Sequence, residues 1–378
     1  MKLIRYVADI PFVFIFVFLS VSVSVSVIRN TDAAVKQKQP CNGGSDDVYK
    51  GEWVYDESYP IFDSSKCKSI RREFSCLRNG RSDRNYLNYR WQPSSCTLPK
   101  FDGIDFLRRL KGKKVLFVGD SVSDNQWQSL VCMLQVATGE YSGAAAGEYF
   151  GAAAVTGGNS TSTVRFQKYG VSISMLLSHY LVDIENRKAG RVLNLDSIKD
   201  GEIWEQYDVV IFNTWLWWYR SGPKQPWDYI EYEGKITKDM DRMEAFRKAL
   251  TTWAKWVNSK ANPKAIYFFQ GISPMHYRGE DWNKPGVKNC ANETTPLKGS
   301  LYRGGEPLAS KVLKDVLNTQ VSPPSRVHLL DITTLSQLRK DGHPGTHGTF
   351  GMDCTHWCIA GVIDTWNLIL YSQLIRAI

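Results

Sequence analysis

Several signatures of common functional classes are absent from this sequence. Its 8 cysteines include no CxxC pair, which argues against zinc binding and thioredoxin-like redox chemistry. The formal net charge is +9, but lysine and arginine form no dense run, so nucleic acid is not expected as a partner. The charge fits a well-solvated surface first and an acidic polymer second. No metal site is predicted.

The N-terminus and the cysteines indicate the secretory pathway. Residues 10–28 carry no charge and are long enough to span a bilayer, with Lys2 and Arg5 before them. This pattern predicts a type II signal anchor with a cytoplasmic tail at 1–9, and a cleaved signal peptide with secretion is the alternative. The sequons at Asn159 and Asn292 suit glycosylation in the lumen. An even set of cysteines there predicts up to four disulfides, with roughly a hundred pairings open.

The rest of the chain divides by composition into three parts. A short polar stem at 29–40 precedes a cysteine-rich region at 41–96, which has many aromatic and turn residues and little expected regular structure. The region at 97–378 alternates apolar runs with amphipathic segments and is expected to form the main domain.

Within the main domain, four short apolar runs are typical of buried parallel strands. These runs lie at 114–118, 208–212, 265–269 and 327–330. Apolar residues at helical spacing predict an amphipathic helix at 240–258. Strands that alternate with helices predict a three-layer α/β fold with a parallel central sheet. In such sheets, ligands bind beyond the carboxyl ends of the strands.

Two distant segments carry the candidate catalytic residues. Ser121 directly follows the first strand and precedes a predicted helix, so its hydroxyl would lie beside N–H groups that can stabilise an oxyanion. Asp353 stands three residues before His356, so its carboxylate can accept the Nδ1 proton and leave Nε2 free to deprotonate a serine. A helix-capping serine and a structural or metal-binding histidine are the alternatives for each segment alone. Together, the segments predict a Ser-His-Asp triad.

Several longer motifs resemble those of a known family. They are GDSVSDNQWQSL (119–130), DCTHWCIAGVIDTWN (353–367), GEWVYDESYP (51–60), NGRSD (79–83), YRWQPSSC (89–96), NTWLWW (213–218) and QPWDYI (225–230). These segments resemble the plant trichome-birefringence-like family, essentially from Cys41 onward. The resemblance implies an SGNH/GDSL-like esterase fold preceded by a small cysteine-rich domain. It also implies O-acetylation of cell-wall polysaccharides in the Golgi.

The resemblance implies a role for each matching residue. Ser121 would be the acetyl-accepting nucleophile, His356 the general base and acid, and Asp353 its orienting partner. The backbone N–H of Ser121 and the side chain of Asn213 would stabilise the oxyanion, although a strand-end asparagine is also a common turn former. The full set of oxyanion and substrate candidates is Gly119, Asp120, Asn125, Asn213, Trp215 and Trp218.

The cysteine pairing and three unusual positions complete the expectations for the site. We hypothesise four bridges, which are Cys41–Cys96, Cys67–Cys132, Cys76–Cys358 and Cys290–Cys354. Asp124, Leu216 and the segment 177–179 depart from the usual family pattern, which affects expectations about substrate choice.

The leading functional hypothesis is an O-acetyltransferase that moves acetyl groups onto wall polysaccharide hydroxyls through an acetyl-serine. A deacetylase with the same triad is the first alternative, and a non-catalytic polysaccharide-binding protein is the second. The polysaccharide is left open among xylan, mannan and pectin. No bound cofactor is expected. The acetyl donor is a separate substrate, with acetyl-CoA as one candidate, although no phosphate-binding glycine loop marks a site for it.

Overall fold

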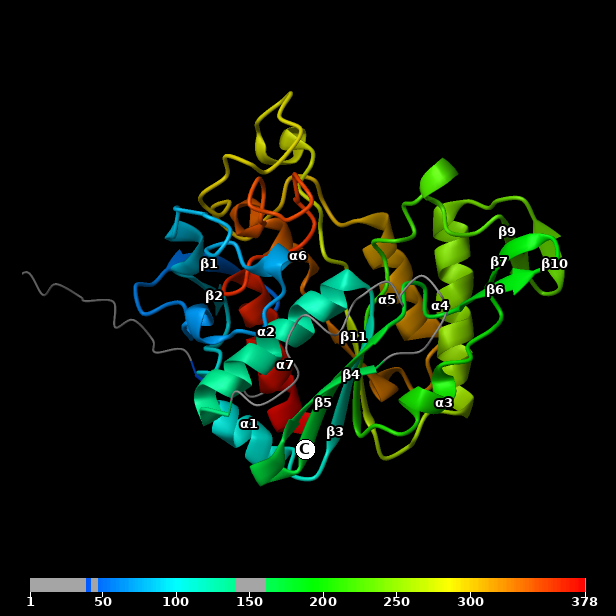
Figure 1. Ribbon diagram of the computed structural model, residues 1–378, viewed down its shortest axis with the longest axis horizontal. Coiled ribbons are helices and arrows are strands. Elements are labelled where there is room, and N and C mark those ends of the chain that lie inside the picture. The colour runs from blue at the N-terminus through cyan, green and yellow to red at the C-terminus, as the bar shows by residue number, and fades with distance from the viewer. Residues whose placement is uncertain (1–38, 42–46, 141–160, 378) are drawn as a thin grey trace, which may run out of the picture. The chain divides into compact units, whose positions relative to one another are not determined.

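A six-stranded sheet forms the centre of the computed structural model, which describes residues 39–41, 47–140 and 161–377 (Figure 1). The strand order is β12-β11-β8-β3-β5-β4. Five strands run parallel, and β4 pairs antiparallel with β5 at one edge. The strands are β3 (Lys114–Gly119), β4 (Thr161–Phe166), β5 (Val171–Leu177), β8 (Val209–Phe212), β11 (Ile266–Gln270) and β12 (Val327–Leu330).

Helices cover both faces of this sheet. Figure 1 shows α1 (Gly103–Arg109), α2 (Ser121–Thr138) and α7 (Val362–Ala377) on one side, and α4 (Arg242–Ser259) and α5 (Leu308–Thr319) on the other. Two short helices, α3 (Gly201–Trp204) and α6 (Thr333–Gln337), lie in connections. The expectation of a three-layer α/β fold is confirmed, with the antiparallel edge strand as an addition.

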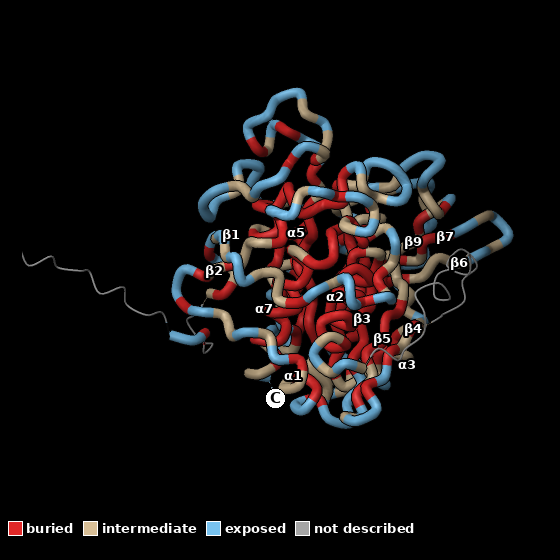
Figure 2. Tube along the Cα trace, turned by 60° about the vertical axis from the view of Figure 1, so that its left-hand side comes forward, coloured by how far each residue is buried: buried red, intermediate tan, exposed pale blue. Residues whose placement is uncertain are grey.

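The alternation of side chains along each strand creates the two cores. Val115 and Phe117 of β3 pack with the α2 and α7 side, whereas Leu116 and Val118 pack with the α4 and α5 side. All four are fully buried, which explains why their run is continuously apolar. The buried segments in Figure 2 gather in the middle of the molecule, and the core on the α2 and α7 side includes Phe74, Tyr86 and Trp91 of the N-terminal region.

Two small sheets flank the central one. An antiparallel pair, β1 (Gly51–Tyr55) and β2 (Tyr89–Pro93), lies in the N-terminal region. A four-stranded sheet has the order β10-β9-β7-β6. Its strands are β6 (Asp183–Arg187), β7 (Gly190–Asn194), β9 (Tyr229–Tyr232) and β10 (Lys235–Thr237).

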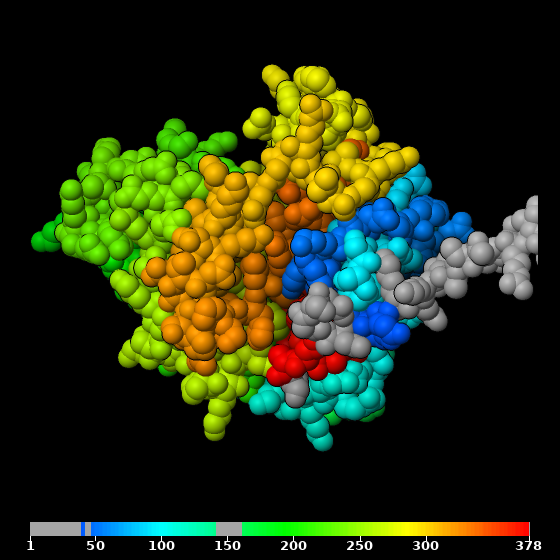
Figure 3. Space-filling model, turned by 180° about the vertical axis from the view of Figure 1, so that it is seen from behind, coloured from blue at the N-terminus to red at the C-terminus, as the bar shows by residue number. Residues whose placement is uncertain are grey.

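Four disulfides fasten the N-terminal region and the C-terminal loops. They join the hypothesised pairs, Cys41–Cys96, Cys67–Cys132, Cys76–Cys358 and Cys290–Cys354. One stays within the N-terminal region, and two tie that region to α2 and to the segment after His356. In the space-filling view from behind, residues 47–97 (blue) lie beside segments from the last third of the chain (yellow to red) (Figure 3).

The expected anchor at 10–28, with the tail before it, and Asn159 lie outside the described residues. Within the described part, none of the helices combines the length and apolar character that crossing a membrane requires. Asn292, the other sequon, is exposed.

Candidate active site

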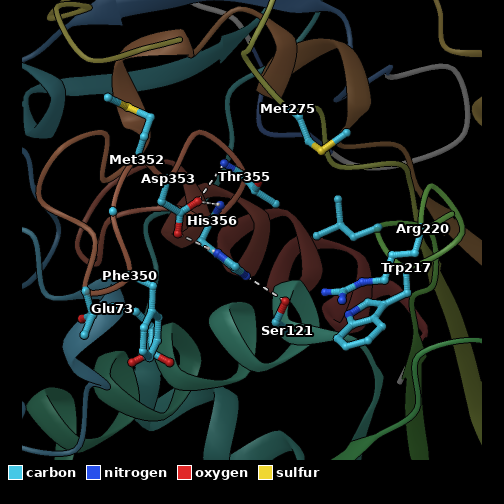
Figure 4. Close-up of a pocket in the computed structure, with 13 residues that line it drawn as sticks. Glu73, Ser121, Trp217, Arg220, Met275, Phe350, Met352, Asp353, Thr355 and His356 are labelled. Atoms are coloured by element: carbon cyan, nitrogen blue, oxygen red, sulfur yellow. Dashed lines mark hydrogen bonds and ion pairs between the residues drawn. The ribbon is translucent and has the colours of Figure 1, made fainter. Parts of the chain in front are cut away.

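Three side chains form a continuous hydrogen-bonded chain at the carboxyl end of β3. The Ser121 hydroxyl oxygen lies 2.7 Å from Nε2 of His356. Nδ1 of His356 lies 2.8 Å from Oδ2 of Asp353. Figure 4 shows the imidazole between the serine, on the first turn of α2, and the carboxylate. The structure therefore brings together the three residues expected to form the triad.

The turn between β3 and α2 holds Ser121 at this position. Asp120 caps α2, and its Oδ1 accepts hydrogen bonds from the N–H of Val122 and from the side-chain amide of Asn213. A side chain at Gly119 would come within 2.3 Å of the Ser123 hydroxyl and 2.5 Å of the Asn213 carbonyl oxygen. Glycine is therefore required for this close approach of strand, helix and neighbouring loop.

The loop that carries His356 is fixed from several sides. The Asp353 Oδ1 accepts from the N–H groups of Thr355 and His356, at 2.9 Å and 3.0 Å. Disulfides at Cys354 and Cys358 attach the loop to the rest of the chain on both sides of the histidine. Since the loop is short and bonded at both ends, the imidazole has little freedom to turn away from the serine.

Buried Asn125 adds a further attachment for this loop. Its side chain accepts from the Trp357 N–H at 2.8 Å and donates to the Trp357 carbonyl at 3.1 Å. This residue was a candidate for the oxyanion or substrate site, but the structure has it joining α2 to the histidine loop. These two bonds use the amide oxygen and one amide hydrogen of Asn125.

The electrostatic environment favours a basic histidine beside an ionised carboxylate. Burial opposes protonation of His356, but the hydrogen bond and the charge of Asp353 outweigh it and raise the pKa of the imidazole. Burial likewise opposes ionisation of Asp353, but the hydrogen bonds from His356 hold the pKa of the carboxyl far below its usual range. Burial raises the pKa of Asp120, although the hydrogen bonds that its carboxylate accepts from backbone N–H groups act to lower it.

A cavity of about 300 Å³ opens next to the Ser121 hydroxyl. Trp217 and Arg220 form one wall, and the Arg220 guanidinium stacks on the Trp217 ring at 3.4 Å from its centroid. Phe350 and Met352 line the opposite, more exposed side (Figure 4). Described residues that line the cavity are Glu73, Ser121, Leu216, Trp217, Arg220, Met275, Thr349, Phe350, Gly351, Met352, Asp353, Thr355 and His356.

The structure buries both tryptophans that were candidates for the substrate site. Trp215 and Trp218 are 4% and 0% exposed and pack on Phe246 of α4, so neither presents a face to the cavity. Trp217, between them, is the tryptophan that lines it. In this irregular turn, side-chain direction follows no strand or helix period, so the sequence offered no signal to choose among the tryptophans.

The N-terminal region also contributes to the site, which the sequence did not indicate. Glu73 lines the cavity, and the Phe74 ring packs on His356 with the ring centroids 5.5 Å apart. Asp124 of α2, one of the positions that depart from the family pattern, is buried and accepts a hydrogen bond from Arg71 of the N-terminal region. Burial raises the pKa of Asp124 to about 6, although Arg71 acts to lower it.

A serine at the tip of a parallel strand, bonded to a histidine from the C-terminal part of the chain, is the arrangement expected of an SGNH/GDSL-like acyl esterase. Comparison with family models agrees. Residues 98–373 match the GDSL/SGNH-like acyl-esterase family found in Pmr5 and Cas1p, and residues 45–97 match the PMR5 N-terminal domain. The chain belongs to this family.

Relatives from Arabidopsis thaliana confirm the resemblance seen in the motifs. Protein trichome birefringence-like 41 is 51% identical over 337 residues, which cover 87% of this chain and 90% of the relative. Protein trichome birefringence-like 39 is 46% identical and covers 86% of each chain. Protein trichome birefringence is 36% identical over 87% of this chain and 56% of its own length.

Proposed function

We propose that this protein is an O-acetyltransferase that moves acetyl groups onto hydroxyls of plant cell-wall polysaccharides through an acetyl-serine. The observation that carries the proposal is the 2.7 Å contact between the Ser121 hydroxyl and His356 Nε2 beside an open cavity. Membership of an acyl-esterase family supports the reaction class.

In the first half-reaction, His356 Nε2 takes the proton of Ser121 as the serine oxygen bonds to the acetyl carbonyl carbon of the donor. The bond from that carbon to the donor then breaks, and the donor leaves with the proton from His356. Asp353 holds the imidazole in the tautomer that has Nε2 free, and its charge stabilises the imidazolium. Acetyl-CoA is the candidate donor, bound only as a substrate.

In the second half-reaction, a sugar hydroxyl gives its proton to His356 and attacks the acetyl-serine. The serine oxygen leaves and recovers the proton. The oxyanion in both steps would accept from the N–H of Ser121, which has no intrahelical acceptor because it lies in the first turn of α2. Asn213 donates one amide hydrogen to Asp120, and its second hydrogen could supply the other donor.

The wall formed by Trp217 and Arg220 would bind the sugar chain. An aromatic face suits stacking on a sugar ring. Arg220 is the only lysine or arginine among the described residues that line the cavity, and none of the described carboxylates lies within ion-pair distance of it. A guanidinium without an acidic partner suits the carboxylate of an acidic polysaccharide, so we place such a polymer ahead of a neutral one.

Donor-dependent transfer by the purified full chain tests the proposal. Acetyl-CoA is incubated with xylan, mannan and pectin oligosaccharides, and products are measured by mass spectrometry. We expect an acetyl gain on one oligosaccharide class and none with Ser121→Ala. Ser123→Ala is the matched control because this nearby serine is buried and does not line the cavity. Equal transfer by the Ser121→Ala variant would refute the proposal.

A polysaccharide acetylesterase is the second candidate, favoured by the description of the matched family as acyl esterases. It would use the same first half-reaction, with water in place of the sugar hydroxyl. Release of acetate from acetylated glycans, with no donor-dependent gain on any acceptor, would select this function. Glycan binding that persisted while Ser121→Ala kept biological activity would instead select the non-catalytic alternative.

We further propose that the protein acts in the Golgi lumen, with residues 10–28 as its anchor, and that secretion to the wall is the alternative. Exposed Asn292 is the described candidate for glycosylation. Fractionation of plant cells together with glycosidase treatment tests both statements. Recovery of the protein in the wall fraction with its N-terminal segment removed would support secretion.

A further inference from the structure

Two buried histidines, His276 and His343, lie next to the loop that carries His356 and contact each other. Nδ1 of His276 lies 2.6 Å from Nε2 of His343. The far nitrogen of each ring contacts a main-chain carbonyl. His276 Nε2 lies 2.9 Å from the oxygen of Gln337, and His343 Nδ1 lies 2.7 Å from the oxygen of His356. The imidazoles are 0% and 2% exposed, so water does not substitute for these contacts.

The two carbonyls fix the position of a proton on each ring. A carbonyl oxygen can only accept, so His276 must carry a hydrogen on Nε2 and His343 a hydrogen on Nδ1. In neutral rings this leaves His276 Nδ1 and His343 Nε2 both as bare acceptors, facing each other at 2.6 Å. Turning either ring over would put carbon atoms where nitrogen now contacts its partners, so a flip does not remove the conflict.

One additional proton resolves this conflict. We propose that His276 and His343 share a single proton along their Nδ1–Nε2 axis, and that this charged pair is a positioning device for His356. A metal ion does not fit between them, because two Zn–N bonds of about 2.0–2.1 Å at tetrahedral angles separate the nitrogens by more than about 3 Å.

The surroundings of the pair allow one positive charge but not two. Burial lowers the pKa of His276 to about 4 and that of His343 well below its ordinary value, which keeps a second proton off the pair at neutral pH. Burial also disfavours the first proton. Binding that proton, however, replaces a repulsive contact between two lone pairs with a charge-assisted hydrogen bond, which favours the protonated pair. Nearby charged groups act in both directions. Asp341, Glu293 and Asp353 favour the proton, whereas Lys340, His356 and Arg81, which donates to the His343 carbonyl, oppose it.

The pair is connected to the catalytic loop at two points. The His343 ring donates to the carbonyl of His356, and the main-chain N–H of His276 donates to the carbonyl of Cys354 at 3.0 Å. The His343 ring also stacks on Trp357, with ring centroids 4.0 Å apart. The position of the His356 backbone therefore depends on a bonding chain that is complete only when the shared proton is present.

The protonation state predicts a two-sided pH dependence of stability. Below the pKa of an unfolded histidine, about 6.5, the unfolded chain binds two protons at these residues and the folded pair binds one, so stability falls as pH decreases. Between about 6.5 and the pKa of the shared proton, the folded pair holds one proton and the unfolded chain none, so stability falls as pH rises and the contribution is lost above that pKa. The contribution of the pair is therefore largest near about pH 6.5.

Nuclear magnetic resonance of the full chain tests the proton directly, without any variant. The chain has 6 histidines, so selective ¹⁵N labelling gives a readable spectrum. We expect one proton resonance far downfield of ordinary imidazole N–H signals, coupled to one nitrogen of each ring, at neutral pH. Two rings that both report neutral nitrogens from about pH 5 to about pH 9, without that resonance, would overturn the proposal.

A variant tests the effect on catalysis, which rests on the proposed function. The side-chain amide of His276→Asn can donate permanently to His343 Nε2, so this pair no longer needs the extra proton. We expect the downfield resonance to vanish. In the wild type, loss of the shared proton at alkaline pH should release the His356 loop and lower the rate, and we expect this loss of rate to be at least about threefold smaller in His276→Asn. His328→Asn, on β12, is the matched control. Parallel pH–rate profiles for His276→Asn and the wild type would reject the positioning role. An inactive wild type that shows the resonance would instead refute only the proposed function.

Discussion

Replacing Asp353 with asparagine changes the tautomer of His356 while leaving the loop bonded. The Asp353 Oδ1 accepts from two backbone N–H groups, and an asparagine oxygen can keep both. The other oxygen, 2.8 Å from Nδ1, becomes an NH₂ group that can only donate. The imidazole must then carry its hydrogen on Nε2, where it can no longer accept the proton of Ser121.

The expected loss follows from this tautomer change. The equivalent substitution in a serine-protease triad lowers kcat about 10⁴-fold. At about 1.36 kcal/mol for each factor of ten, this loss corresponds to about 5 kcal/mol of transition-state stabilisation. Because the backbone bonds remain, we expect Tm to change by no more than about 2 °C, since about 1 kcal/mol shifts Tm by about 2–4 °C in chains of about 150–250 residues and by less in a longer one.

Initial rates of acetyl-ester cleavage, together with a thermal melt of the same preparation, measure both quantities. Asp228→Asn is the matched control, because this exposed carboxylate pairs with Arg191 away from the cavity. Retention of a kcat within about tenfold of the wild type by Asp353→Asn would show that the carboxylate does not set the tautomer, and the reasoning on the triad would fail.

Three further outcomes are expected. The raised pKa of His356 means that kcat/KM should increase with pH through a midpoint above about 6.5, measured by initial rates, and Asp353→Ala should lower that midpoint. Arg220→Gln should reduce the preference for acidic over neutral oligosaccharides about tenfold, measured by competition between the two. Burial raises the pKa of Asp364 to about 7, so this carboxyl stabilises the fold when protonated and the contribution is lost as pH rises from about 4 to about 7. Asp364→Asn should remove this pH dependence, on the order of 4 kcal/mol, in denaturant unfolding at about pH 4 and about pH 8.

Each outcome has a result that would contradict it. A kcat/KM midpoint at or below that of a free histidine would contradict the effect of Asp353 on His356. An unchanged preference for acidic oligosaccharides in the Arg220→Gln variant would mean that Arg220 does not bind their carboxylates. Parallel stability curves for the wild type and Asp364→Asn would mean that this buried carboxyl is ionised throughout the range.

The strands that carry the site could be predicted because burial on both faces leaves a simple pattern. The apolar runs at 114–118 and 327–330 correspond to β3 and β12 within a residue at each end. The pattern fails for β4, whose sequence TSTVRF is rich in hydroxyl residues because it lies at the sheet edge. The helix α7 was also not predicted, because it is buried on nearly all sides and lacks an amphipathic period.

The candidate site shows a similar division between local and distant information. Ser121, Asp353 and His356 belong to short motifs whose chemistry can be read from neighbouring residues. Glu73 and Arg220 reach the cavity only through the tertiary structure, and no local pattern distinguishes them from other surface charges. Sequence reasoning therefore finds the residues of the proposed triad more readily than the residues that line the cavity beside them.

The packing of Phe74 on His356 has a consequence for protein engineering. Although family models divide this chain at residue 97, the shorter part supplies a surface against the reactive imidazole and is covalently joined to the longer part by Cys67 and Cys76. In a chimera that exchanges only the longer part between relatives, Glu73 and Phe74 would face a cavity and an imidazole from another protein. We therefore expect such chimeras to keep their activity better when both regions are exchanged together.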